Sequence, residues 1–162
     1  MAEGAPIIID IEASGFASEA YPIEVGLVLE DGKTYCSLIA QPEEWTYWDD
    51  EAEKVHRVAR DILETYGRPI EEVAGTLNEM LNGKTAYSDG WEVDNPWLSS
   101  LFWKAEMAKS FRFSTLEMII SDNQFKTWHD AKDSVLEEMD ANRHRASLDA
   151  VVIQKTYMRT KA

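Results

Sequence analysis

The chain has 162 residues and a formal net charge of −14, from 16 Lys and Arg against 30 Asp and Glu. This charge argues against a protein that holds nucleic acid on a globally basic surface, because such binding depends on many Lys and Arg contacts to phosphates. The hydrophobic fraction of 44% argues against disorder, and the length fits a single domain over residues 1–162.

The cysteine content and the hydropathy of the sequence suggest the cellular compartment of the protein. Cys36 is the one cysteine in the sequence, so the chain cannot form an internal disulfide, and it fits a reducing cytoplasm. No apolar run approaches the roughly 20 residues that a membrane helix needs. We therefore expect a cytoplasmic protein without a membrane partner.

The first part of the chain predicts strands. Residues 7–9 are a β-branched run typical of a strand buried on both faces. Residues 23–29 and 34–40 flank an Asp-Gly turn and predict a hairpin. Glu24, within the first of these runs, either supports a site or points to solvent. Together the runs predict a mixed sheet with at least three early strands.

The period changes from Asp49 onward. Apolar residues at helical spacing predict helices, and short β-rich runs predict further strands. The expected helices cover 61–66, 69–81, 95–108, 125–139 and 146–158, and the expected strands cover 85–88 and 111–113. Within helix 95–108 we expect Trp97, Phe102 and Trp103 to pack in the core. This order of elements predicts a single-domain α/β fold, with a central mixed β-sheet flanked by α-helices.

Two acids follow the first predicted strand directly. Asp10 and Glu12 are two residues apart, so in a strand their side chains point to the same face. Two like charges this close disfavour joint ionisation unless a positive charge lies between them. The alternative is a solvated strand end, because an Asp-x-Glu pair is a weak motif by itself.

A second candidate group begins the last predicted helix. His144 and Asp149 are five residues apart, so within a regular helix their side chains would diverge by roughly 140°. They can share one cleft if His144 lies on the loop before the helix and Asp149 lies inside it. The alternative is an ordinary surface or core histidine.

These motifs resemble a known family. The segment around Asp10 and Glu12, Ile-Ile-Ile-Asp-Ile-Glu-Ala-Ser-Gly-Phe, resembles the first motif of the DEDD 3′–5′ exonuclease superfamily. The segment from His144 to Asp149, His-Arg-Ala-Ser-Leu-Asp, resembles the third motif of its histidine subclass (DEDDh). Residues 22–28 and 55–58 resemble segments between these motifs, so the likeness runs over about residues 7–158. The resemblance implies a ribonuclease H-like fold.

The second motif of the family is less clear in this chain. Asp94 followed by Trp97-Leu98 reproduces the family's Asp-x-x-aromatic-Leu pattern at a helix N-terminus. Asp94 could instead be an ordinary N-cap, a position that Asp favours. Asp89 is the competing carboxylate, because it comes straight after the strand predicted at 85–88. We assign Asp94 to the second motif.

Four carboxylates gathered in one cleft would repel one another without cations. Two divalent ions with oxygen ligands, Mg²⁺ or Mn²⁺, would resolve that repulsion and clamp a phosphodiester. The resemblance implies that Asp10, Glu12, Asp94 and Asp149 hold these metals, with Asp10 between them. It also implies that His144 is the general base, because an imidazole can accept a proton from water near neutral pH.

The resemblance also implies a substrate. It predicts stepwise 3′→5′ release of nucleoside 5′-monophosphates from DNA or RNA. The backbone near Ala13 and Ser14, with Phe16, would receive the terminal nucleotide, and His56 and Trp91 are further candidates for contact with it. Residues 143–162 carry a net charge of +4, which favours brief contact with a single-stranded 3′ end over a firm hold on long duplex.

Other interpretations stay open on the sequence alone. The family resemblance also allows a homodimer. A different class of function is a non-catalytic module, on a degenerate exonuclease fold, that binds an end or a protein partner. A third reading is a phosphodiesterase that acts on small molecules.

Overall fold

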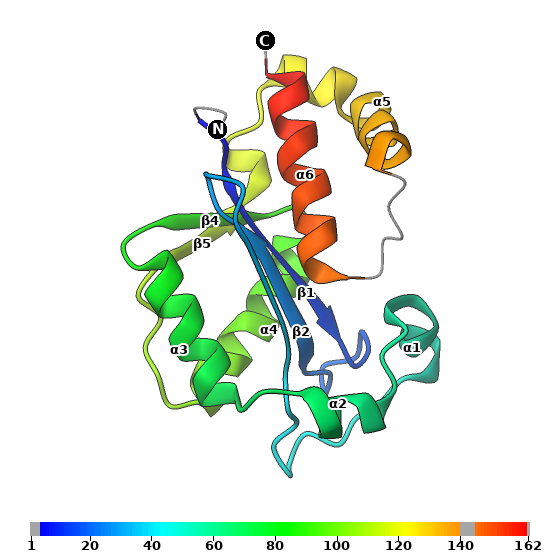
Figure 1. Cartoon of the computed structure of the whole chain (residues 1–162), viewed down its shortest axis with the longest axis vertical. Coiled ribbons are helices and arrows are strands. Elements are labelled where there is room, and N and C mark those ends of the chain that lie inside the picture. Colours follow the sequence, from blue (N-terminus) through cyan, green and yellow to red (C-terminus); the bar gives the residue numbers. More distant parts are fainter. Residues whose placement is uncertain (1–3, 140–144, 162) are drawn as a thin grey trace.

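The computed structural model describes residues 4–139 and 145–161 (Figure 1). His144, the predicted general base, therefore lies outside the described residues. The described chain forms one five-stranded sheet in the order β3-β2-β1-β4-β5, with helices packed against it. The predicted α/β architecture with a central mixed sheet is confirmed.

Strand β1 (Ile7–Ala13) occupies the centre of the sheet. It pairs antiparallel with β2 (Pro22–Val28), which pairs antiparallel with β3 (Thr34–Leu38). On its other edge β1 pairs in parallel with β4 (Thr85–Ser88), which pairs in parallel with β5 (Arg112–Thr115). The Asp-Gly turn closes the predicted hairpin between β2 and β3.

The helices follow the predicted order with shifted ends and one addition. The unpredicted helix is α1 (Asp50–His56), which is capped by the Asp49 side chain. The expected helix 95–108 is α4, which begins and ends four residues earlier. The remaining elements are α2 (Arg60–Tyr66), α3 (Ile70–Leu81), α5 (Asp122–Met139), α6 (Ala146–Thr160) and a 3₁₀ turn, η1 (Leu116–Met118).

The side chains of β1 alternate between two apolar clusters. Ile7, Ile9 and Ile11 belong to the larger cluster, which includes residues of α3 and α4. Ile8 points to the opposite face and packs with Ala150 and other residues of α6. Because alternate residues of a strand share a face, Asp10 and Glu12 lie on the same face as Ile8, under α6.

One expectation about the core is wrong. Trp103 was expected to be buried, but its side chain is 83% exposed. Leu98, Leu101 and Phe102 form the buried face of α4, and at 3.6 residues per turn Trp103 lies about 140° from Leu98 around the helix axis. Phe102 is buried as expected and Trp97 packs half-buried against the same core.

None of the helices within residues 4–139 and 145–161 is both long enough and apolar enough to span a membrane.

Candidate metal centre

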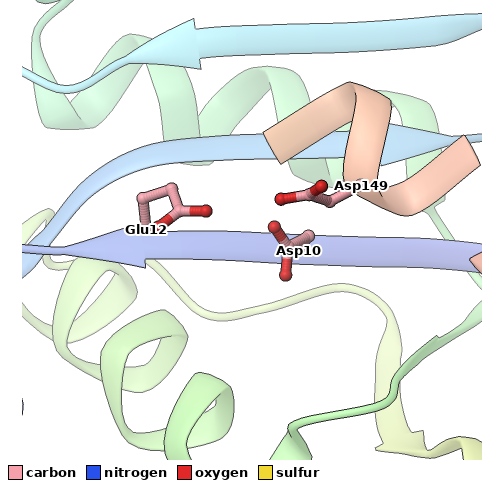
Figure 2. A group of neighbouring side chains, drawn as sticks. All are labelled: Asp10, Glu12 and Asp149. Carbon is pink, nitrogen blue, oxygen red and sulfur yellow. The ribbon is translucent and has the colours of Figure 1, made fainter. Parts of the chain in front are cut away.

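Three carboxylates from the two ends of the chain meet at the centre of the sheet (Figure 2). Asp10 and Glu12 extend from β1, and Asp149 extends from the first turn of α6. One oxygen of each carboxylate lies within 4.8 Å of the others, and all three residues are half-buried. The fold therefore brings together Asp10 and Asp149, which are 139 positions apart in the sequence, as the sequence analysis predicted.

The position of these acids follows from the sheet topology. The parallel pairing of β1 with β4 covers Ile7 and Ile8 and stops there, so Asp10 lies just beyond the paired part of β1. In open α/β sheets, ligands bind in the crevice outside the carboxyl ends of neighbouring parallel strands. Asp10 and Glu12 lie at such a place.

A glycine lets α6 approach the sheet closely enough to bring Asp149 there. Gly26 of β2 lies directly across from Asp10 in the β1–β2 ladder. A Cβ atom at residue 26 would lie 2.0 Å from the backbone nitrogen of Ser147, which is far inside contact distance. The start of α6 therefore rests on the backbone of β2, and any larger residue at position 26 would push α6 away from the acids.

Burial and like charges together disfavour the ionised form of Asp10 when no cation is bound. Burial raises the pKa of Asp10 well above its usual range, and the charges of Asp94, Glu12 and Asp149 raise it further. A divalent cation would reverse this effect, because it favours the ionised carboxylates. The donor set consists of hard carboxylate oxygens, which are the ligands that Mg²⁺ and Mn²⁺ prefer.

Asp94, which we assigned to the second motif from the sequence, lies buried beside this cluster. It stands in the first turn of α4 with 4% of its surface exposed, and it accepts a 2.5 Å hydrogen bond from the Ser88 hydroxyl. Burial raises its pKa to about 7, although the Ser88 hydrogen bond acts in the opposite direction. Its oxygens are outside the group of three that lie within 4.8 Å of one another.

Asp89 has a different environment. It is exposed, and its carboxylate lies 4.0 Å from the ammonium of Lys132. Of the acids that raise the pKa of Asp10, Asp94 acts most strongly and Asp89 least. The N-cap of α4 is Gly90, so the reading of Asp94 as an ordinary N-cap is wrong.

The residues predicted to receive a nucleotide continue from β1. Ala13 ends the strand, and Ser14 is fully buried, with its backbone N–H donating to Tyr21 and its hydroxyl accepting from the Tyr21 N–H at 3.1 Å. The Ser14 carbonyl accepts a hydrogen bond from the Asp49 N–H. Three hydrogen bonds thus hold Ser14 in place, whereas the Phe16 ring beyond it is 77% exposed.

His56 ends α1 and is buried. Its Nδ1 accepts the Val58 N–H at 3.0 Å, which leaves the proton on Nε2, and its ring packs edge-on against Trp48 with 5.6 Å between centroids. Burial lowers its pKa. The buried Nε2 has no hydrogen-bond partner among the described residues. His56 is therefore held as a neutral ring with one unused donor.

Trp91 begins α4 and lies half-buried against the larger apolar cluster. Its indole N–H donates to the Phe113 carbonyl at 3.1 Å. This hydrogen bond fixes the ring between α4 and β5. The indole N–H is therefore already used and is not free to bind a base.

Glu24 is a residue whose role the sequence left undecided between support of a site and exposure to solvent. Its side chain is completely buried, and it contacts the start of α6 rather than solvent. Glu24 stands out because it is a buried acid that pairs with Glu12 across the two strands. This can be recognised only once the register of β1 against β2 is known.

The arrangement of the sheet and helices defines the chain as an α/β protein with a ribonuclease H-like fold. Solved structures with a similar arrangement include exonucleases I. The zinc-bound E. coli exonuclease I–ssDNA complex matches with a TM-score of 0.70 at 9% identity, covering 96% of this chain and 40% of that chain. E. coli exonuclease I with a dA16 oligonucleotide gives 0.67 at 9% identity, covering 95% and 39%.

A moderately thermophilic exonuclease I from Methylocaldum szegediense gives a TM-score of 0.58 at 11% identity, covering 75% of this chain and 29% of that chain. No protein-family model matches this chain, and no curated protein does. At these identities the likeness establishes the fold, and it confirms the fold that the motif resemblance implied. This chain spans between 29% and 43% of the length of the exonuclease I chains it matches.

Proposed function

We propose that this protein is a metal-dependent 3′–5′ exonuclease that releases nucleoside 5′-monophosphates. The observation that carries the proposal is the meeting of Asp10, Glu12 and Asp149 at the carboxyl end of the central strand. The same fold occurs in exonuclease I, and the three acids belong to the sequence segments that resemble the DEDDh motifs. The domain would comprise residues 1–162.

The residues present fit divalent cations. Three carboxylate oxygens within 4.8 Å of one another, beside the further buried acid Asp94, form an oxygen-rich site whose members repel one another unless cations bind. We assign Asp10, Glu12, Asp94 and Asp149 as the ligands of two ions, Mg²⁺ or Mn²⁺. When bound, such ions supply positive charge to the phosphate oxygens and make a bound water more acidic.

The chain's own residues supply the remaining steps. We assign His144 to take the proton from the attacking water, a role that an imidazole side chain can fill. The turn at Ala13 and Ser14, with the exposed Phe16 ring and with His56 and Trp91, positions the last nucleotide. In-line attack then breaks the last phosphodiester bond and leaves a new 3′ hydroxyl on the shortened strand.

We propose single-stranded 3′ ends as the substrate class. E. coli exonuclease I structures with the same fold contain dA16, dA13 and dT13 oligonucleotides. The net charge of −14 disfavours a long duplex, which needs many basic contacts, whereas a strand end needs few. The free thiol of Cys36 supports a reducing cytoplasm as the compartment.

The test is release of mononucleotides from single-stranded DNA, duplex DNA, RNA and dinucleotides labelled at the 3′ end, with Mn²⁺ or with EDTA. We expect nucleoside 5′-monophosphates with Mn²⁺, fastest from single strands, and no release with EDTA. Binding of ends without release would indicate a non-catalytic module. Turnover of a small phosphodiester alone would indicate a small-molecule phosphodiesterase, and either result would contradict the proposal.

A further inference from the structure

We infer that Glu24 is a positioning residue that fixes the start of α6 and thereby holds Asp149 in the metal centre. The inference rests on the proposed function, because it concerns the geometry of that same site. Glu24 is not among the three carboxylates that lie close enough together to hold a metal ion. Its role is exerted through the helix that carries Asp149.

Among the described residues, the Glu24 carboxylate contacts the start of α6, its N-cap residue Arg145 and the neighbouring strand β3. Its Oε1 accepts the backbone N–H of Ala146 at 2.9 Å, across 122 positions of sequence. Its Oε2 lies 3.5 Å from Nε of Arg145 and accepts the Cys36 thiol at 3.4 Å. The side chain is 0% exposed. A buried carboxylate is costly unless it is paired in this way, so these contacts are what makes a charge acceptable here.

Helix α6 needs such a partner because it has no cap of its own. Its N-cap residue, Arg145, makes no side-chain capping hydrogen bond. The first N–H groups of any helix lack partners inside the helix, and the positive end of the helix dipole favours a negative charge. Glu24 supplies both the acceptor and the charge from another element. The hydrogen bond joins a charged acceptor to an N–H and is of the stronger kind.

The register of the sheet places this tie next to the acids. Glu24 pairs with Glu12 and Gly26 pairs with Asp10, and one further pair, Ile11 with Val25, lies between them. Because alternate residues of a strand share a face, the two pairs are neighbours on the face that α6 covers. The start of α6 lies over Gly26 and is bonded to Glu24. Asp149 follows one helical turn later, where its N–H donates to the Arg145 carbonyl. Glu24 thus holds the turn of α6 from which Asp149 reaches Asp10.

The tie opposes the repulsion inside the site. Without cations, the charge of Asp149 and the charges on β1 push α6 away from the strand. A fixed helix start keeps the oxygens close before a metal arrives, and a ligand set that is already in place binds with less reorganisation. Weakening the tie should therefore weaken metal binding.

Two conservative variants separate reach from charge. Glu24→Asp keeps the charge but is one methylene shorter, so it cannot reach the Ala146 N–H at the same distance. Glu24→Gln loses the charge but keeps a carbonyl oxygen at the right reach. Isothermal titration of the full chain with Mn²⁺ alone measures the Kd. We expect Glu24→Asp to raise the Kd about tenfold and Glu24→Gln to raise it less than about threefold.

A matched control lies on the same helix. Gln154 is buried, and its amide donates to the carbonyls of Pro6 and Leu29 at 2.9 and 2.8 Å. Gln154→Leu removes two neutral hydrogen bonds about two turns from the start of α6. We expect Gln154→Leu to lower the Tm in EDTA and to leave the Mn²⁺ Kd unchanged. If the role of Glu24 were purely structural, both Glu24 variants would give this same result.

The outcomes are distinguishable. A larger Kd increase for Glu24→Asp than for Glu24→Gln, with Gln154→Leu unchanged, supports the inference. Equal increases in Kd, or a larger increase for Glu24→Gln, would overturn the inference, because metal binding would then not depend on the reach of the side chain. An unchanged Kd in both Glu24 variants would overturn it while the proposed function stands. Absence of Mn²⁺ binding by the unaltered chain would overturn both.

Discussion

The first and second halves of β1 are parts of one strand with opposite effects on the fold. Ile7, Ile8 and Ile9 are at most 5% exposed and pack into apolar clusters on both faces. Asp10 and Glu12 follow directly, at the point where pairing with β4 has ended, and they face another acid. The first half lowers the free energy of the folded chain, and the second half raises it unless cations are bound.

The difference teaches where stability and activity are separated in this chain. The apolar half fixes the strand at the centre of the sheet. The strand therefore holds like charges at a spacing that is electrostatically unfavourable. The free energy that burial contributes therefore maintains the site, and changes in the two halves should have different effects. Four experiments test this separation, in order of decreasing expected effect.

The largest effect is expected from the charged half. Asp10→Ala, Asp149→Ala and His144→Ala should each lower exonuclease turnover by at least about a thousandfold, which is about 4 kcal/mol of transition-state stabilisation. Removing a repelling acid leaves the core intact, so the Tm of Asp10→Ala should not fall in EDTA. Release of labelled mononucleotides and thermal melting measure the two quantities. Unchanged turnover in Asp10→Ala would end the proposed mechanism.

The apolar half should respond in the opposite way. Ile9 is 1% exposed in the larger cluster, so Ile9→Ala should cost about 2–5 kcal/mol of unfolding free energy through lost burial and the cavity left behind. Urea unfolding in EDTA measures this cost. Turnover per folded molecule should stay within about twofold, since Ile9 points away from the acids. A specific loss of turnover without destabilisation would break the separation.

Metal binding should relieve the strain of the charged half. At a hundred times the Kd, Mn²⁺ or Mg²⁺ should stabilise the folded chain by about 2.7 kcal/mol. A thermal melt across a titration of each metal measures the effect, and Ca²⁺-free EDTA buffer gives the baseline. Asp10→Ala should lose most of the stabilisation. A Tm that stays flat across the titration would contradict a metal centre here.

The smallest effect separates the two candidate acids of the second motif. The pKa of Asp94 is raised to about 7, above its usual value near 4, so between these pH values the folded state binds a proton more tightly than the unfolded state. The contribution of Asp94 to stability therefore falls as the pH rises from about 4 to 7 in metal-free protein.

Asp94→Asn should remove this loss and stabilise the metal-free chain at pH 8 by on the order of 2 kcal/mol. Asp89→Asn is the matched control, because Asp89 is exposed and its removal should change stability by less than about 0.5 kcal/mol. Urea unfolding at pH 5 and pH 8 in EDTA measures both. An equal gain in the two variants would contradict the burial of Asp94 as the cause.

Much of the fold could be predicted from local patterns. The run of Ile residues and the Asp-Gly turn predict β1 and the hairpin, because burial and turn geometry are local requirements. Helix α1 was missed because it buries only Ala52 and His56 and has no apolar stripe. Helix α4 begins four residues earlier than expected because Pro96, which suggests a helix start, lies inside it instead.

The candidate site was predictable in part. The order of the motifs predicted that Asp10, Glu12 and Asp149 share one site, and in the structure their carboxylates lie close together. The choice of Asp94 over Asp89 needed burial, which depends on how α4 meets the sheet. The role of Glu24 depends on a contact across 122 positions. Tertiary contacts of this kind leave no local pattern in a single sequence.

The long sequence separation between Asp10 and Asp149 sets a time order during synthesis. At translation rates of about 5–20 residues per second, Asp149 is made roughly 7–30 s after Asp10. Through this interval the nascent chain carries the acids of β1 without α6, and the hydrophobic face of β1 around Ile8 has no helix to cover it. Helix α6 therefore covers Ile8 and brings Asp149 to Asp10 and Glu12 in the same folding step.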